Sequence, residues 1–259
     1  MLDTMHYILG AISGGLVGFT LGLVGGGGSI LAVPLLVYLV GVKSPHVAIG
    51  TSALAVAANA AIGLVHHFRE GNVRWRCGLM YAGTGVIGAL AGSTLGKAFD
   101  GHKLLFLFAL LMIVVAVLML RRRKDGGGEF GGFQREFAPK IIGYGLGTGG
   151  FSGFFGIGGG FLIVPGLIAS TGMPMINAVG TSLVAVTAFG LTTALNYAAS
   201  GMVDWPLAGI FIVGGVAGSF IGTRAAGRLA GKGQLTTIFA ALVLVVAFYM
   251  LWKSFGAML

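Results

Sequence analysis

Apolar stretches of about 14 to 23 residues alternate with short polar clusters along nearly the whole chain. Five such stretches occur in the first half, at roughly 6–24, 29–41, 45–66, 76–96 and 104–120. Five more follow in the second half, at roughly 140–156, 160–172, 175–198, 206–226 and 234–252. A helix of about 20 apolar residues crosses the hydrocarbon core of a bilayer. The pattern therefore predicts an all-α integral membrane protein with about five apolar segments in each half.

The composition agrees with a chain that is solvated by lipid. Of the 259 residues, 56% are hydrophobic and only 9% are charged, and the mean hydropathy is +0.96. A soluble domain carries about a quarter charged residues. Residues 1–6 lack the basic start of a cleavable signal peptide, so we expect the first stretch to remain as a helix.

The net charge of +9 is explained by basic residues that orient the chain in the membrane, not by a surface that binds nucleic acid. Basic residues lie in the short loops between apolar stretches, where they act as orientation signals, and no basic face is available for nucleic acid. The single cysteine, Cys77, permits no internal disulfide and no cysteine metal site.

The two halves of the chain resemble each other. An offset of 130 residues brings Val47–Gly92 onto Asn177–Gly222 without a gap, and Gly, Pro and Trp positions align as shared apolar composition would not make them. Matched positions include Gly50-Thr51-Ser52 with Gly180-Thr181-Ser182, Trp75 with Trp205, Gly85, Gly88 and Gly92 with Gly215, Gly218 and Gly222, and, at an offset of 131, Gly25 and Pro34 with Gly156 and Pro165. The sequence thus predicts a membrane repeat at 1–120, a basic, Gly-rich cytoplasmic linker at 121–138 and a second membrane repeat at 139–259.

Loop charge predicts that the second repeat is inverted. The loop at 66–76 carries Arg69, Arg74 and Arg76, whereas its counterpart at 196–206 has no Lys or Arg and contains Asp204. If positive loops stay inside, equivalent loops face opposite sides of the membrane. The N-terminus then lies outside.

In each half, a glycine-rich break precedes a short apolar segment. At about 1.5 Å per residue, a 13-residue segment is shorter than a bilayer core of roughly 30 Å, so we expect half-helices. Paired Gly-interrupted segments at corresponding places are a pointer to a transporter's substrate site, and the exposed N–H groups at a helix start favour an anion. The alternative is that these glycines only permit close helix packing. Neither break fits a phosphate-binding or dinucleotide-binding loop, and no cofactor is predicted.

Hydroxyl and amide side chains near these segments could donate to an anion without bringing a counter-charge. For Thr and Ser, the alternative is a hydrogen bond within or between helices. The candidate substrate-binding residues are Gly25, Gly26, Gly27, Gly28, Ser29, Thr51, Ser52, Asn59, Gly156, Gly158, Gly159, Gly160, Thr181, Ser182 and Asn196.

None of the seven acids lies inside an apolar segment. Pumps and cation antiporters commonly use such groups as proton or ion relays, so their absence argues against a cation substrate. The adjacent His66 and His67 point to different faces of a helix and do not form a metal site. Neither a metal site nor a catalytic residue is predicted, and the chain is not expected to be an enzyme.

The Gly-rich breaks with their following prolines, the repeated Gly-Thr-Ser and the basic central loop together resemble the TauE/SafE family of sulfite and organosulfonate exporters. The resemblance covers essentially the whole chain. It implies a multi-pass secondary transporter of small sulfur-containing anions in a bacterial or archaeal inner membrane. An anion channel, an uptake permease and a structural membrane scaffold remain alternatives. The expected partners are the anion and the bilayer; whether the chain forms a homo-oligomer stays open.

Overall fold

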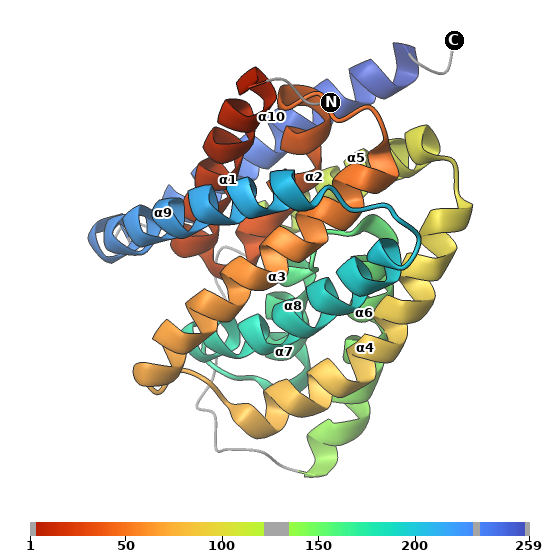
Figure 1. The fold of residues 1–259 in the computed structure, drawn as a ribbon. Helices are drawn as coiled ribbons and strands as arrows, with labels where there is room; N and C mark the ends of the chain where they lie inside the picture. The colour runs from red at the N-terminus through yellow and green to blue at the C-terminus, as the bar shows by residue number, and fades with distance from the viewer. Residues whose placement is uncertain (1–3, 122–134, 230–233, 257–259) are drawn as a thin grey trace.

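The computed structural model describes residues 4–121, 135–229 and 234–256, and the regular structure within these ranges is helical throughout (Figure 1). Six of the described helices are long and apolar enough to cross a membrane. The helices of 18 residues or more, a set that includes these six, are α1 (Thr4–Val24), α3 (Pro45–Arg69), α4 (Trp75–Ala98), α5 (Gly101–Arg121), α6 (Ala138–Phe155), α8 (Met175–Ala198), α9 (Trp205–Leu229) and α10 (Gln234–Gly256). The all-α membrane fold is confirmed, and most of the predicted linker lies outside the described residues.

Shorter helical elements follow α1 and α6. The first series is a 3₁₀ helix η1 (Gly25–Leu31), a single turn α2 (Ala32–Pro34) and a π turn η2 (Leu35–Leu39). The second is α7 (Gly160–Thr171), and a short 3₁₀ turn η3 (Arg135–Phe137) precedes α6. Apart from η3, which lies in the predicted linker, these elements coincide with the short apolar segments that the sequence predicts.

Helices α3 and α8 pack against each other at the centre of the bundle. Of the residues in the apolar spans of α3 and α8, 61% and 67% are buried, more than in the other four candidate spans. Gly50 near the start of α3 lies against Tyr197 near the end of α8, and Gly63 lies against Leu183. The two helices therefore run antiparallel. Because Gly101 packs on Pro45, the α4–α5 turn lies at the end where α3 begins, which we name the α4–α5 end; the opposite one is the α3–α4 end.

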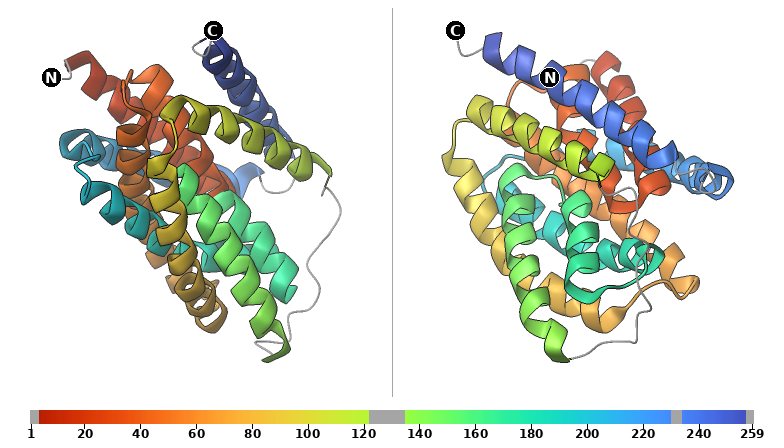
Figure 2. Two further views of the ribbon diagram at one scale, coloured as in Figure 1. Left: turned by 90° about the vertical axis from the view of Figure 1, so that its right-hand side faces the viewer. Right: turned by 180° about the vertical axis from the view of Figure 1, so that it is seen from behind.

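Two helix pairs cross closely on either side of this centre: α1 with α9, and α4 with α6 (Figures 1 and 2). Glycine residues allow the two backbones to approach closely at each crossing. A Cβ atom on Gly18 would overlap the carbonyl oxygen of Gly215, and one on Gly88 would overlap that of Leu146. Small residues of this kind let backbones approach in membranes. Close helix packing therefore accounts for the repeated glycines of α4 and α9.

Contacts between the halves follow one pattern. Helix α1 of the first half packs on α9 of the second, and α6 of the second packs on α4 of the first. Helices α5 and α10, which the sequence offset also matches, lie side by side in both views of Figure 2. Exchanging the two halves leaves this set of pairs unchanged. Each half thus completes its packing only with the other.

Candidate functional site

The two glycine-rich breaks have different backbone structures. Gly156, Gly158 and Gly159 have φ values of +67°, +63° and +67°, a left-handed conformation that favours glycine. They separate α6 from α7 completely. At the first break, Gly25–Leu31 instead continues the chain as a 3₁₀ helix. The sequence predicts two similar interruptions, but only the second is an open turn.

Proline accounts for part of the irregular helix after the first break. Pro34 cannot donate a backbone hydrogen bond, and the chain continues from it as the π turn Leu35–Leu39. Pro165 occupies the corresponding place inside α7, which remains α-helical. The equivalent sequences therefore give a regular half-helix in the second half and a mixed helix in the first.

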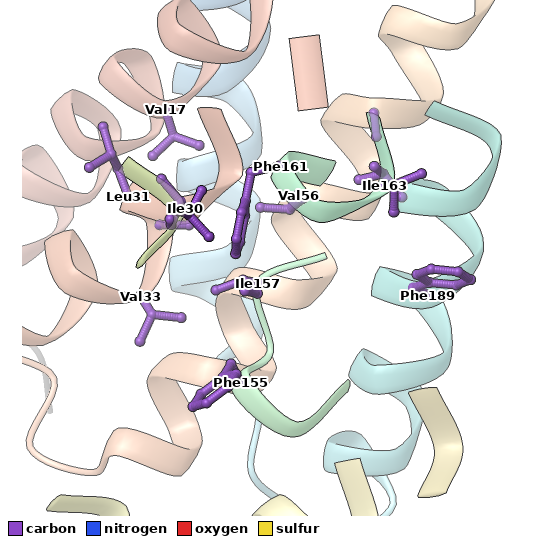
Figure 3. Packing of buried hydrophobic residues seen from close by; sticks show 14 of the residues in the cluster. Val17, Ile30, Leu31, Val33, Val56, Phe155, Ile157, Phe161, Ile163 and Phe189 are labelled. Atoms are coloured by element: carbon purple, nitrogen blue, oxygen red, sulfur yellow. The ribbon is translucent and has the colours of Figure 1, made fainter. Parts of the chain in front are cut away.

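Both breaks lie in one buried region. A Cβ atom on Gly158 would come within 2.7 Å of Val56 Cγ1 in α3 and 3.3 Å of Val186 Cγ1 in α8. Helix α7 packs on η1, and Figure 3 shows the side chains of Ile30, Ile157 and Phe161 close together. These three side chains are buried. Apolar side chains therefore separate the two breaks.

Two serines lie at the second break. The buried Ser52 hydroxyl donates to the carbonyl oxygen of Ile49 at 3.0 Å and to that of Gly156 at 3.4 Å. Ser152 packs against Gly159, and its buried hydroxyl has no hydrogen-bond partner. Ser52 is a predicted site residue. The sequence does not predict Ser152 as a site residue, because nothing in its spacing distinguishes it from a packing serine. Ser29 of the first break is also buried.

Asn59 is a buried polar residue halfway along α3. Its side chain is 2% exposed, and neither amide atom has a hydrogen-bond partner. It faces Gly215 of α9, where a Cβ atom would overlap the amide nitrogen. Gly215 in turn packs on Gly18, one turn before the segment of α1 that packs on Gly28. The amide therefore lies at the α1–α9 crossing, close to the first break.

The threonines of the two Gly-Thr-Ser motifs occupy equivalent places at opposite ends of the central pair. The Thr51 hydroxyl accepts from the backbone N–H of Asp204 at 3.0 Å, and the Thr181 hydroxyl accepts from that of Arg74 at 2.9 Å. Each bond joins one half to the residue before a long helix of the other half. Since Gly63 already faces Leu183, at least 12 residues of α3, about 18 Å, separate the two hydroxyls.

The structure therefore does not bring Thr51 and Thr181 to one site. Ser182, which follows Thr181, donates to the carbonyl oxygen of Val179 within α8 at 2.7 Å.

Asn196 lies near the α4–α5 end, far from Asn59 along the helix pair. Its Nδ2 donates to Ser93 Oγ at 2.6 Å and to Thr94 Oγ1 at 3.1 Å. Its side-chain and main-chain oxygens both accept from Lys97 Nζ, at 2.9 and 3.1 Å. Asn196 thus belongs to a second polar cluster, apart from Asn59 and the breaks, and the sequence alone does not distinguish the two clusters.

A surface hollow of about 440 Å³ opens on the outward flank of α6, between Lys140, Tyr144, Phe151 and Leu162. Its walls are almost entirely apolar, and none of the predicted site residues lines it. An apolar hollow of this kind suits a lipid chain better than an anion, and the two breaks remain the candidate site.

The chain matches a family model described as "Sulfite exporter TauE/SafE" over residues 10–250. It is 52% identical over 248 residues to a "Probable membrane transporter protein" of Xylella fastidiosa (strain 9a5c), with 95% of each chain covered. It is 28% identical over 216 residues to "Probable membrane transporter protein YdhB" of Bacillus subtilis (strain 168), with 81% of this chain and 86% of the relative covered. No solved structure matches. These likenesses and the spanning helices support a multi-pass membrane transporter.

Proposed function

Because the chain belongs to the sulfite exporter TauE/SafE family, we propose that it is a secondary transporter that exports small sulfur-containing anions, such as sulfite or organosulfonates, across the inner membrane. The proposed site lies between the two glycine-rich breaks and Asn59. The two halves expose it alternately to each side of the membrane.

The unpaired amide of Asn59 carries this proposal. A buried amide without a partner costs about 1–3 kcal/mol, and such a group calls for an explanation. Asn59 lies in mid-helix, at 2% exposure, beside the first break. Its Nδ2 can donate two hydrogen bonds to an oxyanion without introducing a compensating charge.

The second break supplies further neutral donors. The N–H groups of Leu162 and Ile163 donate to the Gly159 carbonyl as the first bonds of α7. The N–H groups just before them therefore lie at a helix N-terminus, where they have no intrahelical acceptor and favour negative charge. The unpaired hydroxyl of Ser152 lies beside Gly159. Neutral donors of this kind bind an anion and still release it.

The arrangement of the halves supports alternating access. Helices α3 and α8 match in sequence and run antiparallel where they touch, as an inverted repeat requires, and inverted repeats rock around a midplane site in many secondary transporters. The apolar contact of Ile30, Ile157 and Phe161 keeps the breaks apart in this state. We infer that this contact loosens when the anion enters.

The membrane potential can drive export through such a site. No acid lies inside the described spans, so these spans offer no carboxylate relay that could couple transport to protons. The membrane potential is then the proposed driving force. An inside-negative potential favours the exit of each negative charge by about 2.3 kcal/mol per 100 mV. The basic α3–α4 end then faces the cytoplasm, and the α4–α5 end faces outward.

Counterflow of radiolabelled sulfite in liposomes tests this function. Liposomes that contain the purified protein should take up labelled sulfite against unlabelled internal sulfite, and the initial rate should saturate. Chloride at the same concentration should compete little. A rate that rises linearly with sulfite would identify a channel instead. A rate equal to that of protein-free liposomes, with a protein that melts cooperatively, would reject sulfite as a substrate.

A further inference from the structure

Lys97 lies where α4 ends beside α8, at the α4–α5 end. Its ammonium group donates three hydrogen bonds: to the main-chain oxygen of Asn196 at 3.1 Å, to Asn196 Oδ1 at 2.9 Å and to Ser200 Oγ at 2.9 Å. All three acceptors are uncharged. The positive charge of Lys97 is held in place but is not neutralised by them.

The acids at this end are engaged elsewhere. Asp100 Oδ1 accepts from the backbone N–H groups of His102 and Lys103 at the start of α5. Asp204 Oδ1 accepts from the N–H of Leu207 in the first turn of α9. One side-chain ion pair within the described ranges joins His66 to Glu70, at the opposite end. Lys97 therefore has no carboxylate partner among the described residues.

Two buried polar atoms around Tyr197, the residue whose ring lies beside Lys97, have no hydrogen-bond partner. They are the hydroxyl of Tyr197, a residue that is 0% exposed, and Nδ1 of His46. The two rings lie 6.3 Å apart, and Lys97 Nζ lies 6.0 Å from the centre of the Tyr197 ring. A cationic donor and two unused polar groups thus gather where α3 begins and α4 and α8 end.

A purely structural clasp between α4 and α8 would account for the three bonds of Lys97, but it leaves the Tyr197 hydroxyl and His46 unexplained. The other half of the chain does not repeat the full cluster. At the sequence offset of 130, Gly227 corresponds to Lys97, Ile176 to His46 and His67 to Tyr197. The His67 Nδ1 atom is also buried and unpaired, but no lysine accompanies it at the matched position, so the cationic donor belongs to one end of the molecule only.

The cluster is adjacent to the second glycine-rich break. The Tyr197 hydroxyl approaches Gly96, which packs on Phe154 in the last turn of α6. Gly50 packs on Tyr197, and the neighbouring Ile49 packs on Gly156. The cluster of Lys97, Tyr197 and His46 therefore lies between the second break and the α4–α5 end.

We propose that Lys97, Tyr197 and His46 form a second anion-binding site, which holds a small oxyanion between the midplane site and the outer solution. The identity of the oxyanion rests on the proposed function. The uncompensated charge of Lys97 attracts the oxyanion, and the Tyr197 hydroxyl donates a hydrogen bond to it. Because all three N–H groups of Lys97 already have acceptors, a direct bond from Lys97 requires that the oxyanion replace one of them, such as the Ser200 hydroxyl. The uncharged acceptors around Lys97 leave its charge available and hold the ammonium group in position.

Sodium sulfite titration of the purified full-length protein tests this site through the rise in its melting temperature. Ionic strength is held constant with sodium chloride. Lys97→Gln should raise the apparent Kd for sulfite about ten-fold, the loss expected for one charged donor. Lys103→Gln is the matched control, because it removes the same charge from an exposed side chain at the same end, and it should leave the Kd unchanged.

Tyr197→Phe provides a second variant that is expected to fold normally, since it removes only an unpaired hydroxyl. It should also weaken sulfite binding. The difference between Lys97→Gln and Lys103→Gln should persist in an Asn59→Leu background, where the midplane site is impaired.

Equal sulfite affinity in wild type and Lys97→Gln would overturn this second site, and so would a wild type that sulfite does not stabilise. The outcome is separable from the proposed function. Lys97-dependent stabilisation without counterflow would reject transport of sulfite and keep the site. Counterflow together with an unchanged sulfite affinity in Lys97→Gln would keep sulfite transport and reject the second site.

Discussion

Asn59 and Phe189 occupy equivalent positions in the two halves, and each faces an equivalent glycine of a long helix. Asn59 of α3 lies against Gly215 of α9, and Phe189 of α8 lies against Gly85 of α4. The Phe189 ring also stacks on Tyr81, with ring centres 6.4 Å apart. The amide of Asn59, by contrast, has no hydrogen-bond partner. The space above each glycine forms a notch in the helix surface, filled by Asn59 at Gly215 and by Phe189 at Gly85. Because the notch accepts an apolar side chain in one half, packing alone does not require a polar side chain in the other.

The largest effect should follow from removing this asymmetry. Asn59→Leu should lower sulfite counterflow at least about ten-fold, because it removes a charge-assisted donor to the anion. It should also leave stability unchanged or raise it by about 1–3 kcal/mol, since an unpaired buried amide is lost. Counterflow and melting temperature of the same preparation measure the two effects.

Phe189→Leu is the matched control at the equivalent position. It should keep counterflow within about two-fold and should lower stability, because a buried ring loses contacts. If Asn59→Leu lost stability as Phe189→Leu does and kept full counterflow, Asn59 would be a packing residue and the proposed site would fail.

The notches themselves should be sensitive to one added methyl group. Gly85→Ala places a Cβ atom on the Phe189 ring, and Gly215→Ala places one on the Asn59 amide. Overpacking of this kind costs about 1–3 kcal/mol. We expect Gly85→Ala to cost more, because the Phe189 ring also stacks on Tyr81 and has less room to move. Chemical denaturation in detergent micelles measures the difference.

Each of these losses should be relieved by a smaller side chain opposite. Phe189→Ala should partly offset Gly85→Ala, and Asn59→Ala should partly offset Gly215→Ala. Gly83→Ala is a control, since a Cβ atom there meets no atom within 4 Å. Strict additivity of the pairs would show that the notches do not set these contacts.

The threonine bonds should behave alike in the two halves. Thr51→Val leaves the N–H of Asp204 unpaired, and Thr181→Val leaves that of Arg74 unpaired. Each should lower stability by about 0.5–1.5 kcal/mol, while Thr→Ser at either position should restore most of it. A large loss of sulfite affinity with unchanged stability, in either Val variant, would instead indicate direct contact with the anion.

Much of the fold could be predicted from the sequence because its signals are local. The ten apolar stretches and the two Gly-rich breaks follow from hydropathy and from glycine spacing, and the observed segments differ from them by only a few residues. The roles of the threonines could not be predicted, since Thr51 bonds to a residue 153 positions away. The polar cluster of Lys97 also depends on tertiary contacts. Neither the sequence offset nor loop charge distinguishes Lys97 from an exposed lysine.

The smallest effect concerns Asp100 and Asp204, one acid from each half, which both cap helices at the α4–α5 end. The backbone N–H of Lys103 donates to Asp100 and lowers the pKa of its carboxyl below the ordinary value. A lowered pKa in the folded state means that the stabilisation is complete above the unfolded value, near pH 4, and is lost as the pH falls through the lower folded value. The wild-type melting temperature should therefore decline slightly below about pH 4, and Asp100→Asn, which keeps an acceptor oxygen without the charge, should remove part of that decline. An identical acid profile for both proteins would show that the capping bond of Asp100 does not contribute to stability in solution.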